Sequence, residues 1–180
     1  MSRPEPDPTI PALLAHSADH RPDAELVVLG DRRLTGAAAQ RESADLARGL
    51  LAAGVGKGTR VGLLMSNGPD WVVAWLAASR IGALVIPICT FYQPRELLWT
   101  LRHADVQVLL TVSRFLGRDY LARLEEAIPG LAGQGRTPLY LKELPCLRQV
   151  WVWGDCERSW ACPAAPDLHL DEAQARAAWD

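Results

Sequence analysis

Residues 54–88 limit the fold more than any other stretch, because two short apolar runs flank a segment of helical pattern. The first run is Val61–Met65, bounded by turn residues, and the second is Ala83–Ile88. Short apolar runs of this kind predict buried strands. Strand, helix and strand in immediate succession form a βαβ unit, so we expect the two strands to be parallel and covered on both faces.

The segment between the two runs carries signals for the start and the end of a helix. Pro69 suits the first helical turn, where its missing N–H costs nothing, and Asp70 lies favourably at the positive end of the helix. Gly82 suits the left-handed residue that closes a helix. Apolar side chains follow at helical spacing between these signals, and we expect Trp75 and Leu76 to face the sheet.

Three motifs in this stretch carry a family resemblance. They are the turn Gly54-Val55-Gly56-Lys57-Gly58-Thr59-Arg60-Val61, the helix start Asn67-Gly68-Pro69-Asp70-Trp71, and the exit Arg80-Ile81-Gly82-Ala83 followed by Pro87-Ile88. Their order and spacing resemble the N-terminal part of the AMP-forming acyl- and aryl-CoA synthetases. This adenylate-forming family includes luciferases and peptide-synthetase adenylation domains. Arg95-Glu96-Leu97 also looks like the family, whereas Leu34–Ala39 lacks the Tyr and Glu-Leu of its pattern.

The βαβ pattern and the resemblance imply an α/β fold. We expect an open, mainly parallel, doubly wound sheet with helices on both faces, plus an N-terminal β-hairpin. The resemblance covers most of residues 9–155, which we expect to form the N-terminal subdomain of a larger catalytic domain. Residues 1–8 are expected to be a flexible lead, and residues 156–180 an irregular tail with a short helix at Glu172–Trp179.

Turn and capping residues place the elements of the N-terminal half. Thr9 predicts the cap of a helix that ends near His20. Gly30-Asp31 separates two short runs, Glu25–Leu29 and Arg32–Leu34, which predicts a β-hairpin with a two-residue turn. Thr35 predicts the cap of a second helix, whose buried stripe is expected at Ala44, Ala47, Leu50 and Leu51.

The C-terminal half shows further apolar periodicity. Pro94 is expected to open a helix. The pattern then predicts a buried strand at Val106–Thr111, a helix at Phe115–Ile128, and a last strand at Leu147–Trp153. Pro129–Pro138 is rich in Pro and Gly and is predicted to be a linker.

Composition limits the class of partner. The chain has 180 residues and a net charge of −2, which gives no electrostatic argument for nucleic acid or an anionic membrane. No apolar run has the length of a membrane-spanning helix, and the N-terminus lacks the apolar core of a signal peptide. We therefore expect a cytoplasmic protein with no nucleic-acid partner and no membrane span.

Two groups of residues invite a metal hypothesis. Cys146, Cys156 and Cys162 precede His169, but their spacings match no standard zinc finger or ribbon. His16 and His20 lie one helical turn apart, as in the inverted zinc-protease motif, but the acidic residue between them is Asp, which is shorter than the required Glu. We expect no metal site and reduced thiols.

The chemistry of the family lies outside the region of resemblance. The reaction joins a carboxylate to the α-phosphate of ATP and passes the acyl group to a thiol, with Mg²⁺ and cations stabilising the charge. Neither Lys57 nor Lys142 matches a family lysine, and Gly54–Gly58 follow a helix, so they form no phosphate cradle. We therefore expect no catalytic or cofactor-binding residue in this chain. The resemblance implies ATP, Mg²⁺ and coenzyme A only for the full-length family.

These expectations favour an N-terminal fragment of a fatty or aryl acid–CoA ligase that ends before the phosphate loop and is inactive alone. One loop still suggests a contribution. Ligands of open parallel sheets meet the carboxyl ends of strands, so Thr90, Phe91 and Tyr92 after Pro87 are candidates for the wall of an acyl or pantetheine channel. The alternative is that Phe91 and Tyr92 pack in the core.

A second class of function stays open, a non-catalytic α/β module for interaction or assembly.

The fragment hypothesis has a consequence for the surface. If the phosphate-loop subdomain is missing, apolar side chains of the seam are left in water and favour self-association. The strand ending at Trp153 is then also partly unpaired. The seam candidates are Phe91, Tyr92, Trp151, Trp153 and Trp160.

Overall fold

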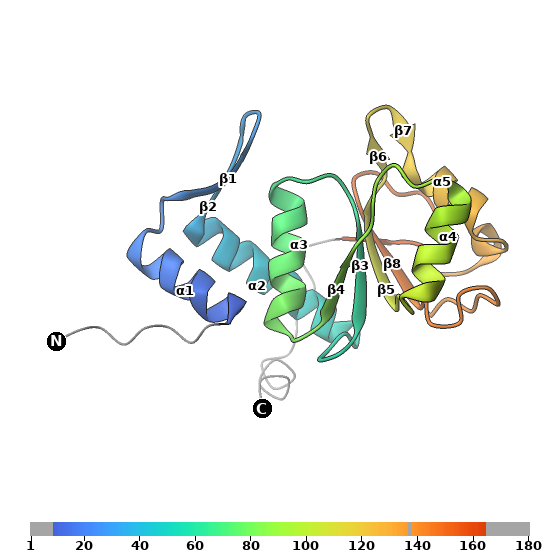
Figure 1. The fold of residues 1–180 in the computed structure, drawn as a ribbon, viewed down its shortest axis with the longest axis horizontal. Coiled ribbons are helices and arrows are strands. Elements are labelled where there is room, and N and C mark those ends of the chain that lie inside the picture. The colour runs from blue at the N-terminus through green and yellow to red at the C-terminus, as the bar shows by residue number, and fades with distance from the viewer. Residues whose placement is uncertain (1–8, 137, 165–180) are drawn as a thin grey trace. The chain divides into compact units, whose positions relative to one another are not determined.

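The computed structural model describes residues 9–136 and 138–164 (Figure 1). These residues divide into two compact units. Among these residues, the first unit comprises 9–56 and 67–82, and the second comprises 57–66 and 83–164. Over the described residues, the chain enters the second unit with one strand, returns to the first for a helix, and continues in the second from residue 83.

The first unit consists of three helices and a β-hairpin. Its helices are α1 (Ile10–His20), α2 (Gly36–Ala52) and α3 (Pro69–Arg80), and its hairpin pairs β1 (Glu25–Leu29) with β2 (Arg32–Thr35). The helix starts follow the predicted chemistry. The hydroxyl of Thr9 accepts a hydrogen bond from the Ala12 N–H at 3.4 Å, and that of Thr35 accepts one from the Ala38 N–H at 3.2 Å.

The core of the first unit lies where its helices pack together. Leu14 of α1, Leu50 of α2 and Leu76 of α3 are all buried. The predicted stripe on α2 is confirmed for Ala47 and Leu50, and Leu46 belongs to it as well. β1 contributes little to this core, since most of its residues are exposed.

The second unit is built on a five-stranded sheet in the order β4-β3-β5-β8-β9. The strands are β3 (Arg60–Leu64), β4 (Leu84–Pro87), β5 (Val108–Val112), β8 (Gln149–Trp153) and β9 (Cys162–Pro163). All four neighbouring pairs are parallel. The open parallel sheet of an α/β protein is thus confirmed. So is the βαβ pattern, because β3, α3 and β4 follow one another in the chain and the two strands pair.

Two helices of the second unit cover one face of this sheet (Figure 1). They are α4 (Pro94–His103) and α5 (Tyr120–Ala127). A single apolar cluster joins them to the strands, with Leu97 and Leu101 from α4, Tyr120 and Leu124 from α5, and Leu109, Val150 and Val152 from the sheet. Among the described residues, no helix is long and apolar enough to cross a bilayer.

The predicted helix at Phe115–Ile128 is wrong in its first part. Residues 114–119 form a small antiparallel hairpin of β6 (Arg114–Phe115) and β7 (Arg118–Asp119), and α5 starts only at Tyr120. Leu116 and Gly117 take positive φ angles of 50° and 71°, so the chain turns where the helix was expected. Asp119 then caps α5, because its carboxylate accepts a hydrogen bond from the Ala122 N–H at 2.9 Å.

The segments predicted to be irregular contain some regular structure. The predicted linker holds the 3₁₀ turn η1 (Leu131–Gly133), in which Leu131 is fully buried. The predicted tail contributes β9, which pairs in parallel with β8. The helix predicted at residues 172–179 and His169 lie outside the described residues.

Candidate functional site

The candidate site is the loop that follows β4 at the carboxyl edge of the parallel sheet. β3, β4 and β5 are parallel neighbours, so their carboxyl ends meet at this edge. The loop carries Thr90, Phe91 and Tyr92 and lies wholly within the second unit. This is the edge at which open parallel sheets bind their ligands.

Backbone hydrogen bonds define the course of the loop. The Ile88 N–H donates to the Leu63 carbonyl at 2.9 Å, so the pairing of β4 with β3 continues one residue past Pro87. The Tyr92 N–H donates to the Cys89 carbonyl at 3.3 Å and closes a turn. α4 begins directly afterwards, and the Glu96 carboxylate accepts the Gln93 N–H at 2.8 Å.

The three candidate side chains lie in different environments. Phe91 is 64% exposed, whereas Tyr92 is half-buried and packs against the apolar cluster under α4 and α5. The hypothesis that both aromatics pack in the core is therefore right for Tyr92 and wrong for Phe91. Thr90 is half-buried, and its carbonyl oxygen accepts hydrogen bonds from Tyr120 Oη at 2.8 Å and Arg123 Nη1 at 3.2 Å.

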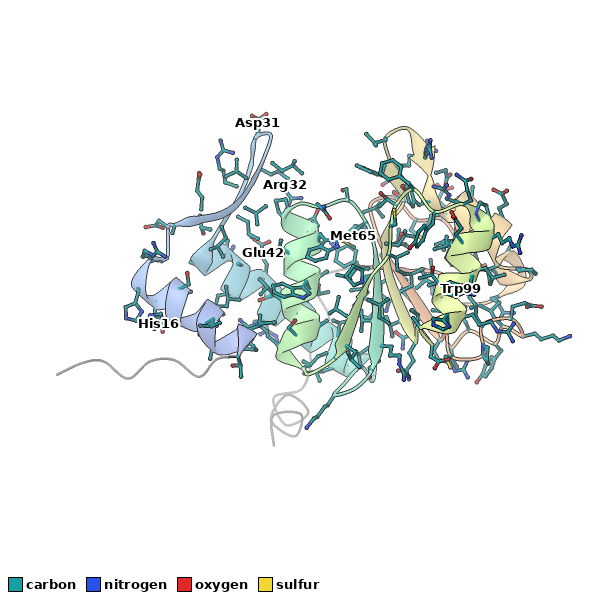
Figure 2. All side chains as sticks on the ribbon, viewed as in Figure 1. His16, Asp31, Arg32, Glu42, Met65 and Trp99 are labelled. Atoms are coloured by element: carbon teal, nitrogen blue, oxygen red, sulfur yellow. The ribbon has the colours of Figure 1, made fainter. Side chains whose placement is uncertain are left out.

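An open groove of about 560 Å³ adjoins this loop along α4. Trp99, which Figure 2 labels on α4, is 63% exposed and stacks on the His103 ring with a centroid distance of 4.6 Å. Sequence reasoning did not predict this groove, because Trp99 lies within an amphipathic helix pattern. The groove is lined by Tyr92, Gln93, Arg95, Glu96, Trp99 and Thr100.

The tryptophans predicted to be left in water are mostly inside the protein. Trp151 is 3% exposed and Trp160 is 1% exposed, while Trp153 is half-buried. The indole N–H of Trp160 donates to Glu125 Oε1 at 3.0 Å, which satisfies its polar atom within the core. β9 also pairs with β8 at Trp151 and Val152, so β8 is an inner strand over these residues.

The lysines and the paired histidines considered for catalytic or metal chemistry do not form such a site. Lys57 and Lys142 are both exposed, in a turn and in a loop. The rings of His16 and His20 stack with centroids 4.0 Å apart on α1. Within residues 9–136 and 138–164, no group of three His, Cys, Asp or Glu side chains is placed to hold a metal ion.

Comparisons with known proteins agree on one family. The model of the family described as AMP-binding enzyme matches residues 14–171. The Bacillus subtilis protein YngI is 33% identical over 163 residues, which are 83% of this chain and 30% of YngI. A methyl-dioxo-octahydroindenyl propanoyl:CoA ligase of Mycobacterium tuberculosis is 35% identical over 132 residues, which are 73% of this chain and 26% of that ligase. The chain thus spans less than a third of each relative.

A solved structure shows the same fold. The anthranilate CoA ligase AuaEII, in complex with anthranoyl-AMP, superimposes with a TM-score of 0.71 at 22% identity. The match covers 87% of this chain and 27% of AuaEII. The sheet and helices described above are therefore an arrangement that a larger CoA ligase contains.

Proposed function

This chain belongs to the AMP-binding enzyme family, and we propose that it is the N-terminal α/β part of an ATP-dependent, AMP-forming ligase that joins a fatty or aryl acid to coenzyme A. The observation that carries the proposal is the family match over residues 14–171, which includes every described strand and helix from α2 onward. Two relatives that are at least 33% identical cover most of the chain, and one of them is named a CoA ligase. A cytoplasmic location is part of the same proposal.

In this proposal the chain supplies architecture rather than the reacting groups. The described residues do not fit an Mg²⁺ site, since no acidic cluster is present among them, and we assign them no step through ATP or Mg²⁺. The complete enzyme would bind ATP, Mg²⁺ and coenzyme A with residues beyond those described.

The proposed contribution of the second unit is a channel wall at the carboxyl edge of its sheet. Phe91 carries this role, because it is the exposed aromatic side chain of a loop whose backbone is held at both ends. An exposed ring on a fixed backbone offers apolar contact area at little cost in conformational entropy. The channel would take either the acyl chain of the acid or the pantetheine arm of coenzyme A.

The test uses a chimera. The segment of the M. tuberculosis ligase that matches this chain is replaced by this chain's own residues, and folding is verified by circular dichroism. ATP–pyrophosphate exchange with the ligase's own acid then reports acyl-AMP formation, and thioester formation reports the second step. We expect the chimera to catalyse both.

Phe91→Ala in this chimera then distinguishes the two channels. An acyl wall raises KM for the acid in pyrophosphate exchange, and a pantetheine wall raises KM for coenzyme A in thioester formation. In either case kcat is unchanged, because the contact is uniform between ground and transition states. Tyr140→Ala is the matched control, since Tyr140 is an aromatic residue that is 71% exposed on a different loop. Unchanged KM values for both substrates would show that Phe91 lines neither channel.

A further inference from the structure

The middle of the candidate loop is attached to α5 by two side chains. The Thr90 carbonyl oxygen accepts hydrogen bonds from Tyr120 Oη at 2.8 Å and from Arg123 Nη1 at 3.2 Å. Tyr120 is the first residue of α5, and Arg123 follows three positions later, so both donors lie on one face of its first turn. One backbone oxygen thus attaches the loop to two side chains of α5, which lie 30 and 33 residues further along the chain.

The two donors also support each other. Tyr120 is 2% exposed and is surrounded by the apolar cluster, so its ring has little freedom to move. The Arg123 guanidinium lies over this ring, 5.9 Å from its centroid, in the geometry of a cation–π contact. The rigid ring therefore aims its own hydroxyl at Thr90 and helps to hold the second donor in place.

Two backbone hydrogen bonds of the described residues also hold the loop. The Ile88 N–H bonds to the Leu63 carbonyl at the start, and the Tyr92 N–H bonds to the Cys89 carbonyl and closes the turn that contains Thr90 and Phe91. Phe91 is exposed in this turn. The bonds to Thr90 join the turn to α5, and so help to set the direction of Phe91.

We propose that Tyr120 and Arg123 are positioning residues, which hold the Thr90 carbonyl so that Phe91 is presented at the carboxyl edge of the sheet. The proposal rests on the proposed function for its role in the reaction, but the attachment itself is a property of this chain. Both residues act through the loop, and neither is assigned contact with a substrate.

Amide hydrogen exchange of the full 180-residue chain, resolved by NMR, tests the attachment directly. Tyr120→Phe removes only the hydroxyl and keeps the buried ring. We expect exchange of the Tyr92 amide to accelerate roughly three- to tenfold, the effect of losing about one hydrogen bond. The amides of Val61 and Leu109, in the central strands, should keep their rates. Tyr140→Phe, at an exposed tyrosine, is the matched control and should leave the exchange rates of all these amides unchanged.

Arg123 provides a second variant with a conservative rescue. Arg123→Met should accelerate the Tyr92 amide in the same way, and Arg123→Lys should restore part of the protection, because an ammonium group also donates to a carbonyl. An equal acceleration in the central strands would show that Tyr120 acts only through stability and would overturn the proposal. An unchanged Tyr92 amide in both Tyr120→Phe and Arg123→Met would overturn it as well.

The reaction provides an independent readout. In the chimera, Tyr120→Phe should raise the same KM that Phe91→Ala raises and leave kcat unchanged. If exchange of the Tyr92 amide accelerates but that KM is unchanged, the attachment is supported and the role of Phe91 as a channel wall is refuted. If the chimera folds but forms no acyl-AMP, the proposed function fails while the exchange result is unaffected.

Discussion

Arg80 at the end of α3 donates a hydrogen bond from Nε to Ser43 Oγ in the middle of α2, at 3.0 Å. Arg80 Nη2 also donates to the Gln40 carbonyl at 3.1 Å, so one guanidinium joins two turns of α2 to α3. Burial lowers the pKa of Arg80, which shows that its surroundings disfavour the charge. The hydrogen bonds to α2 offset that cost, and this link orders the helical core of the first unit.

Ser43→Ala should therefore destabilise the chain, because it leaves a half-buried guanidinium N–H without its acceptor. We expect a loss of about 1–3 kcal/mol in the free energy of unfolding, measured by urea denaturation. Ser79→Ala is the control, since the Ser79 hydroxyl donates to the Trp75 carbonyl of its own helix. Equal losses in the two variants would contradict a specific link between α2 and α3.

Leu76 should contribute strongly to the stability of the chain. It is 6% exposed on α3, so Leu76→Ala removes buried methyl groups and leaves a cavity, at an expected cost of about 2–5 kcal/mol. Leu13→Ala on α1 is the matched control, because Leu13 is 51% exposed and surface substitutions stay within about 0.5 kcal/mol. A urea melt in which Leu76→Ala behaves like Leu13→Ala would show that α3 buries a different face.

The Cys162 thiol should need a raised pH before it reacts. Burial raises the pKa of the Cys162 thiol, Cys156 raises it further, and Arg136 lowers it in part. A thiol with a raised pKa stays protonated while an ordinary thiol ionises, and only the thiolate is alkylated quickly. Iodoacetamide labelling followed by mass spectrometry should therefore modify Cys162 only at a higher pH than a free thiol such as glutathione requires. Labelling of Cys162 at the same pH as the free thiol would contradict the raised pKa.

Self-association should depend on β1 rather than on the tryptophans. Leu26, Val28 and Leu29 are 43%, 50% and 53% exposed on a two-stranded hairpin, and exposed apolar strands favour pairing with a second chain. The double variant Leu26→Thr, Val28→Thr places β-branched residues at both strand positions and removes apolar surface. It should lower both concentration-dependent sedimentation and binding of a hydrophobic dye.

Leu13→Thr is the control for this change, because it removes one exposed apolar side chain of the same unit outside a strand. It should leave sedimentation as it was. A monodisperse monomer at high concentration before any substitution would refute association through β1.

The elements that the sequence predicted well are those set by local chemistry. Thr9 and Thr35 begin helices where their hydroxyls cap the first turn, and Gly30-Asp31 forms the tip of the hairpin, where Figure 2 labels Asp31. The start of α5 was missed because Leu116 and Tyr120 fit a helical spacing. Gly117 and Asp119, a turn residue and a capping residue, were the local signal that could have placed it.

The features that the sequence did not predict depend on distant partners. Trp151 is buried beside a two-residue strand at Cys162–Pro163, which is too short to be recognised from periodicity. The attachment of Thr90 likewise joins residues 30 and 33 positions apart through a backbone oxygen, which has no side-chain signature. The rule that ligands bind at the carboxyl ends of parallel strands therefore predicted the loop, but it did not predict that Tyr120 and Arg123 hold it.

The decisive measurement is ATP–pyrophosphate exchange by the isolated 180-residue chain and, beside it, by the chimera with the M. tuberculosis ligase. We expect exchange at the level of a protein-free blank for the chain alone, and clear acid-dependent exchange for the chimera. Exchange above the blank by the isolated chain would refute the proposed function, because reacting groups would then lie within this chain. A folded chimera without exchange would also refute the proposed function, because these residues would then not serve as the N-terminal part of the ligase.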